Sequence, residues 1–157
     1  MFNKNIIDEI ISIMEKEFST FSESLKGNAK HINFNIGNSI GFSQYEMPIN
    51  VAITMASEKE IEEDNVGLFL NFDIYPVRTE EGNGWFNVPV FKNKIDFEFD
   101  KLYFHLCVET TSGIDICDSA IIQINYSSNA ILEVQDFWKR ESIKILDPIK
   151  VQLEKYK

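Results

Sequence analysis

Hydrophobic residues along this chain recur with two different periods, and the changes of period divide it into three parts. In the first part the spacing is three or four residues. The apolar positions there are Ile6, Ile7, Ile10, Met14, Phe18, Phe21 and Leu25. This spacing builds one apolar stripe and predicts a helix over about residues 5–26. Asn5 can cap its start, and Gly27-Asn28 can supply the left-handed residue that ends it.

From His31 the period changes to two, which is the spacing of a strand with one solvent-exposed face and one buried face. The candidate strands are residues 31–36, 39–45, 49–57, 66–74, 85–91, 95–99, 102–108, 114–116 and 120–124. Their connections are short and contain no helix, so sequential strands should pair antiparallel. We therefore predict a meander-like antiparallel sheet of six to eight strands over about residues 31–126.

The clearest hairpin in this sheet is expected around Asp100-Lys101. Apolar residues fall at odd numbers in 95–99 and at even numbers in 102–108. A two-residue turn explains this change of phase, because the residues that flank such a turn share one face. In that register Asp96 lies directly across from His105.

The chain returns to helical spacing over residues 130–156. The apolar positions are Ile131, Val134, Trp138, Ile145, Ile149, Leu153 and Tyr156. Pro148 interrupts this stripe, and a proline inside a helix costs about 3 kcal/mol. We expect two consecutive helices, with Asp147 as the cap of the second. A single kinked helix and a last strand at residues 130–135 are the alternatives.

Together these patterns predict one α+β domain spanning residues 1–157. The terminal helices carry the apolar stripes that can cover the apolar face of the sheet. The sequence has no apolar run of 18 residues, and acidic residues interrupt the N-terminal apolar stretch, so we expect neither a membrane span nor a signal peptide. Cys107 and Cys117 are too few for a disulfide framework, which favours a cytoplasmic protein with reduced thiols, although one bridge stays possible.

Charge is distributed unevenly along the chain. Met1 to Ser128 carry 20 acidic and 9 basic residues, whereas Asn129 to Lys157 carry 5 acidic and 6 basic residues. A negative body repels nucleic acid and anionic membranes and attracts basic partners. The densest acidic segment is Glu58, Glu60, Glu62, Glu63 and Asp64. We expect a basic protein partner, and neither nucleic acid nor a membrane.

Catalytic and metal chemistry have weak support in the sequence. His105, Asp96 and Cys107 contain the parts of a nucleophile–base pair, which would suit a hydrolase or transferase. However, residues two apart on a strand stand roughly 7 Å from each other, so the polar outer face of a sheet is the simpler interpretation. The candidate metal ligands lack the usual ligand spacing. They are His31, His105, Cys107, Asp115, Cys117 and Asp118. We expect no metal and no cofactor.

The function that these observations favour is non-enzymatic binding of a basic protein. Small acidic immunity proteins of bacteria are similar to this chain in size, charge and architecture, although no motif is shared. Besides the acidic segment 58–64, the expected contact residues are Glu80, Glu81 and Trp85, because tryptophan often anchors interfaces. The alternative is a protein that binds an apolar small molecule between its sheet and its C-terminal helix.

Overall fold

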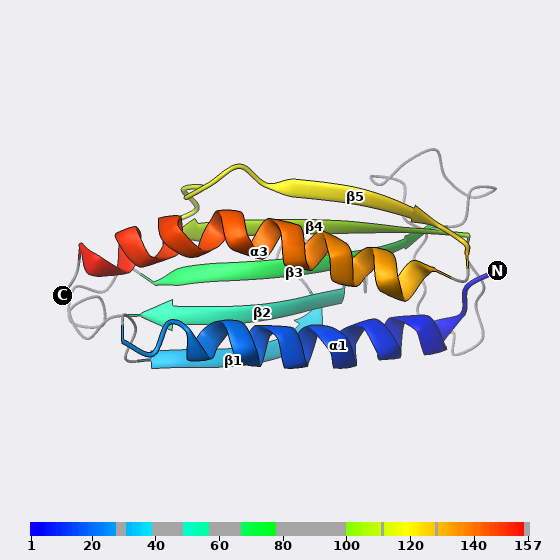
Figure 1. Cartoon of the computed structure of the whole chain (residues 1–157), viewed down its shortest axis with the longest axis horizontal. Helices are drawn as coiled ribbons and strands as arrows, with labels where there is room; N and C mark the ends of the chain where they lie inside the picture. Colours follow the sequence, from blue (N-terminus) through cyan, green and yellow to red (C-terminus); the bar gives the residue numbers. More distant parts are fainter. Residues whose placement is uncertain are drawn as a thin grey trace.

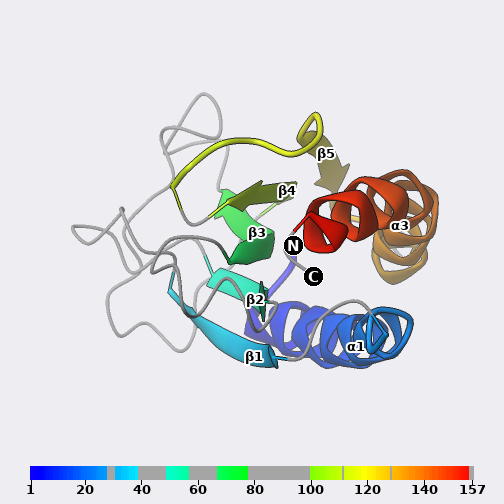
Figure 2. The same cartoon turned by 90° about the vertical axis from the view of Figure 1, so that its left-hand side faces the viewer.

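A computed structural model describes residues 1–27, 31–38, 49–56, 67–77, 100–110, 112–127 and 129–155. Its elements are α1 (Lys4–Glu23), β1 (His31–Asn38), β2 (Ile49–Ala56), β3 (Leu68–Val77), β4 (Lys101–Thr110), β5 (Ala120–Asn125) and α3 (Ala130–Glu154). The strands form one layer, and both helices lie against the same face of it (Figure 1; Figure 2). This arrangement confirms the α+β class and the placement of the terminal helices.

The sheet among the described residues has five strands in the order β1-β2-β3-β4-β5, and every neighbouring pair is antiparallel. The antiparallel meander was thus predicted correctly, but the number of six to eight strands was wrong. One candidate, residues 114–116, forms only an isolated bridge between Asp115 and Glu109. Gly113 turns the chain there at a φ of 87°, which ends the strand. The candidates 39–45, 85–91 and 95–99 lie outside the described residues.

Strand β4 has a neighbour on each side, which overturns the predicted register of the Asp100-Lys101 hairpin. Lys101 to Thr110 pair with β3, and Lys101 to Leu106 also pair with β5. His105 therefore lies between Asp73 on β3 and Ile121 on β5. These two residues occupy both pairing positions beside His105, one of which was predicted for Asp96. The alternation of apolar residues indicates which face of a strand is buried. It does not indicate which of several strands with the same alternation pairs with β4.

Helix α1 buries the stripe that the sequence predicted. Ile7, Ile10, Met14, Phe18, Phe21 and Leu25 are all buried. Its cap is Asn3 rather than Asn5, because the side chain of Asn3 accepts a hydrogen bond from the Asn5 amide at 2.9 Å. The helix ends at Glu23, and the backbone of its C-cap Ser24 is right-handed, so Gly27 is not needed as a left-handed terminator.

Helix α3 is a single element that contains Pro148, so the prediction of two helices was wrong. Residues 130–135 belong to the same helix, which settles the choice between strand and helix. The physical reason is the apolar stripe, which continues across the proline. Ile145 and Ile149 are buried on its two sides, and each such residue stabilises by about 1.5–3 kcal/mol. Together these contacts match or exceed the cost of about 3 kcal/mol for an internal proline.

Aromatic rings fill the space between the two layers. Phe72 stacks on Phe104 at 5.2 Å between ring centroids and lies 6.4 Å from Phe137 of α3. These rings pack against one another between the sheet and α3. The even-numbered residues of β4 belong to this core, which leaves its odd-numbered residues for the opposite face. Neither described helix is apolar over a length that could cross a membrane.

Candidate functional site

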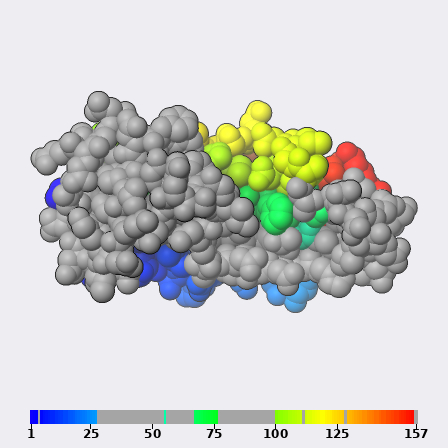
Figure 3. All heavy atoms as spheres, turned by 180° about the vertical axis from the view of Figure 1, so that it is seen from behind, coloured from blue at the N-terminus to red at the C-terminus, as the bar shows by residue number. Residues whose placement is uncertain are grey.

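A polar cluster lies on the face of the sheet that points away from the helices. On β4 the side chains alternate between buried and half-buried positions, and the half-buried set includes His105, Cys107 and Glu109. The register places Asp73 opposite His105 and Asn71 opposite Cys107. Figure 3 views this side, where atoms of β3 and β4 reach the surface.

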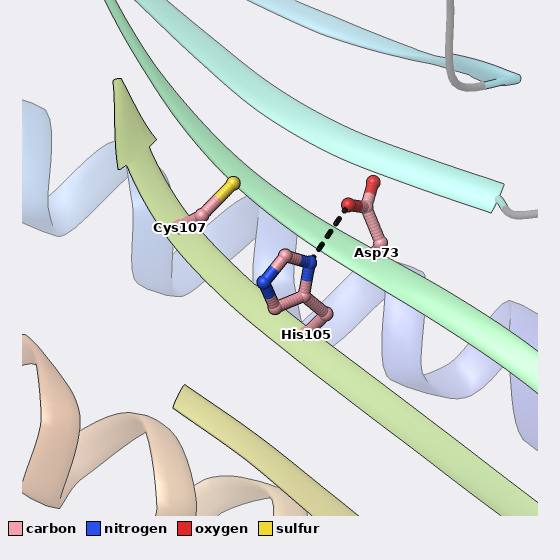
Figure 4. Close-up of side chains that lie close together, drawn as sticks. All are labelled: Asp73, His105 and Cys107. Atoms are coloured by element: carbon pink, nitrogen blue, oxygen red, sulfur yellow. Dashed lines mark ion pairs between the residues drawn. The ribbon is translucent and has the colours of Figure 1, made fainter. Parts of the chain in front are cut away.

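Asp73, His105 and Cys107 approach one another closely (Figure 4). The Asp73 Oδ2 and His105 Nδ1 atoms are 3.6 Å apart. One ligand atom from each of the three residues lies within 4.8 Å of the other two. The side chain of Asp73 is 10% exposed, whereas the side chain of His105 is 21% exposed. The cluster is therefore set into the sheet face but reachable from water.

The thiol of Cys107 lies in a negative environment. Burial, followed by the charges of Asp73 and Glu109, raises the pKa of Cys107 to about 12, against a weaker opposing hydrogen bond from Asn71. The Asn71 Nδ2 atom donates this bond to Cys107 Sγ at 3.9 Å. Burial, Asp73 and Cys107 also raise the pKa of Tyr75. A nucleophilic cysteine needs a lowered pKa, and the pKa of Cys107 is shifted in the opposite direction.

Alkaline pH should therefore destabilise the fold through this cluster. The folded state holds the Cys107 proton up to a pKa of about 12, whereas an unperturbed thiol loses it near 9.0. Below pH 9 the stabilisation is complete, and it falls as pH rises towards 12, because the unfolded chain then binds fewer protons than the folded chain. Urea unfolding across this window measures the effect.

The matched variant for this pH dependence is Cys107→Ser, which keeps a polar group but removes the titrating thiol. We expect its stability to decline less steeply than that of the unmodified protein over the same pH range. Cys117 also has a raised pKa and is present in both proteins, so it contributes a common background. The pKa of Tyr75 is raised in part by Cys107, so any change in its titration belongs to the effect of the substitution. Identical pH profiles would contradict the assignment to Cys107.

The structure joins only part of the site that the sequence indicated. His105 and Cys107 come together, but their acidic partner is Asp73 rather than Asp96. Asp73 is the only charged residue in the alternating run 66–74, and pairing that run with 102–108 could have found it. Asp96 and the expected partner-binding residues lie outside the described residues. Those are Glu58, Glu60, Glu62, Glu63, Asp64, Glu80, Glu81 and Trp85.

The other metal-ligand candidates do not join this cluster. His31 begins β1, and β2 and β3 separate that strand from β4. Cys117 lies between β4 and β5, and both cysteines are free thiols. Glu109 and Asp115 form the isolated bridge, and both carboxylates act electrostatically on Cys107.

No protein-family model, no curated protein and no solved structure matches this chain.

Proposed function

We propose that this protein is a non-enzymatic binding protein that engages a basic protein through the sheet side of its fold. The observation that carries the proposal is the partition of charge between the two layers. The helical segments 1–27 and 129–155 hold 10 acidic and 8 basic residues, whereas the described residues of the strands and the segments beside them hold 5 acidic residues and 1 basic residue. The helix layer is nearly balanced, whereas the described part of the sheet layer is clearly negative. The residues outside the described ranges add 10 acidic and 6 basic residues to the net charge of −10.

Such a partition suits recognition of a cationic surface. Complementary charge raises the rate of association and disfavours wrong partners. Asp115 and Asp118 are exposed in the connection between β4 and β5, on the acidic side of the partition. The acidic segment 58–64, with Glu80, Glu81 and Trp85, supplies the proposed contact residues. An inhibitor of immunity type, acting on a basic toxin in the cytoplasm of a bacterium, is the class of function that this polarity supports.

A charge-matched pair of variants tests the proposal. In the first variant glutamine replaces Glu58, Glu60, Glu62 and Glu63. In the second variant glutamine replaces four exposed residues of the helix layer, which are Glu9, Glu15, Glu133 and Glu154. Both variants change the net charge by the same amount. Their affinity for poly-L-lysine of defined length is measured by biolayer interferometry over a series of salt concentrations.

We expect the first variant to lose about tenfold or more in affinity and the second to lose little, because steering acts over roughly one Debye length, about 8–10 Å. The affinity of the unmodified protein should fall steeply with salt. Equal losses in the two variants would show that net charge alone attracts the polycation. That result, or binding that is indifferent to salt, would overturn the proposal.

A further inference from the structure

The Asp73–His105–Cys107 cluster combines three different donor atoms that can all bind the same kind of metal ion. Carboxylate oxygen, imidazole nitrogen and thiolate sulfur are the three protein ligands of Zn²⁺. Mg²⁺ and Ca²⁺ prefer oxygen ligands throughout, whereas sulfur and imidazole favour zinc and its neighbours among the transition metals. The donor set by itself thus indicates a borderline-soft divalent cation.

The distances agree with this assignment. Metal–ligand bonds of 2.0–2.3 Å in a tetrahedron place neighbouring ligand atoms about 3.3–3.8 Å apart. The Asp73 Oδ2 and His105 Nδ1 atoms are 3.6 Å apart, which is inside that range and beyond the usual N–H···O hydrogen bond of about 2.7–3.2 Å. The longest separation within the cluster is at most 4.8 Å, which exceeds the tetrahedral spacing by at most about 1 Å, so metal binding requires the side chains to move closer together.

The position of the cluster in the sheet also favours a metal site. Strands β3 and β4 are interior strands, since β2 and β5 flank them. Ligands on interior strands are held more rigidly than ligands on loops. Asp73 is buried and Glu109 lies on the same face two residues beyond Cys107, so the surroundings are negative. One carboxylate, one thiolate and a neutral imidazole would balance the two charges of the ion.

We propose that Asp73, His105 and Cys107 bind one Zn²⁺ ion, with a water molecule as the fourth ligand. The thiol proton of Cys107 leaves to solvent when the sulfur coordinates the metal. The partial exposure of His105 gives the ion and the water a route to the site. This proposal is independent of the binding of a basic partner, because it concerns different residues and a different ligand.

The competing interpretation is an Asp73–His105 ion pair on a polar sheet face, in which Cys107 has no part. Titration of the full-length protein with Co²⁺, which occupies zinc sites, distinguishes the two. A thiolate–cobalt complex gives a charge-transfer band in the near ultraviolet and intense visible bands when tetrahedral. We expect both to saturate at one Co²⁺ per chain and to disappear when Zn²⁺ is added.

The chain offers matched controls for two of the ligands. Cys107→Ser should abolish the charge-transfer band, whereas Cys117→Ser should keep it. His105→Gln and Asp73→Asn should weaken Zn²⁺ binding by about 100-fold or more, beyond the 10–100-fold typical of residues that only support a ligand, whereas His31→Gln should not. Circular dichroism of each metal-free variant confirms that it folds.

Three results would overturn the zinc proposal. The first is the absence of a charge-transfer band in the unmodified protein with millimolar Co²⁺. The second is a band that survives Cys107→Ser. The third is a band lost equally in Cys117→Ser. None of these results would affect the charge-partition experiment with poly-L-lysine, so the two proposals fail separately.

Discussion

Replacing Phe72 by alanine is expected to lower the free energy of unfolding by about 3–5 kcal/mol. Phe72 is fully buried on β3 and contacts both Phe104 on β4 and Phe137 on α3. Its removal opens a cavity where the sheet meets α3, and neighbours on rigid interior strands can close it only partly. Urea unfolding followed by circular dichroism measures the change.

The control for Phe72→Ala is Ile121→Ala on β5. Ile121 is 55% exposed on the other face of the sheet, so its truncation should change stability by no more than about 0.5 kcal/mol. A loss below about 1 kcal/mol for Phe72→Ala would contradict the described packing of α3 on the sheet, because truncation of a fully buried phenylalanine lowers stability by more than that.

A second large loss, also about 3–5 kcal/mol, is expected for Trp138→Ala. Trp138 lies on α3 and is 3% exposed. Its ring is 4.9 Å from Phe18 and 5.5 Å from Phe21, both of which belong to α1. The residue therefore links the first helix of the chain to the last, and its removal should weaken the contact between them. Leu132→Ala, on the exposed side of α3, is the matched control.

A double-mutant cycle shows whether Trp138 acts through α1. Phe18→Ala combined with Trp138→Ala should give a coupling energy of about 0.5–1.5 kcal/mol, as aromatic pairs do. Combination of Trp138→Ala with a substitution at the exposed Ile121 should be additive. Strict additivity of the Phe18 and Trp138 substitutions would contradict the ring contact between the helices.

The sequence determined more of the fold than of the site. Local periodicity identified α1, the direction of the meander and the face of β4 that belongs to the core, because the burial of side chains imposes those periods. It also indicated His105 and Cys107 as the residues worth attention. It did not find Asp73, because a carboxylate in an alternating strand is indistinguishable from any solvent-facing residue until its neighbour across the sheet is known.

Two corrections have the same origin. The sequence pattern placed Asp96 opposite His105 because the two segments are adjacent in the chain, yet β4 pairs with β3 and β5. The pattern divided α3 at Pro148 because proline usually interrupts a helix. The prediction did not include the buried apolar stripe that stabilises the helix on both sides of Pro148. In both cases contacts made elsewhere in the molecule overrode the local preference.

By itself the sequence determined the α+β class, the apolar stripes of both helices and the negative charge of the strands and their connections, since each depends on residue identity and spacing alone. Only the tertiary structure decided the strand neighbours of His105, the continuity of α3 and the meeting of Asp73 with His105 and Cys107. Those features depend on which strands pair and in what register, and pairing is set by the burial of the whole sheet against its helices rather than by any single segment.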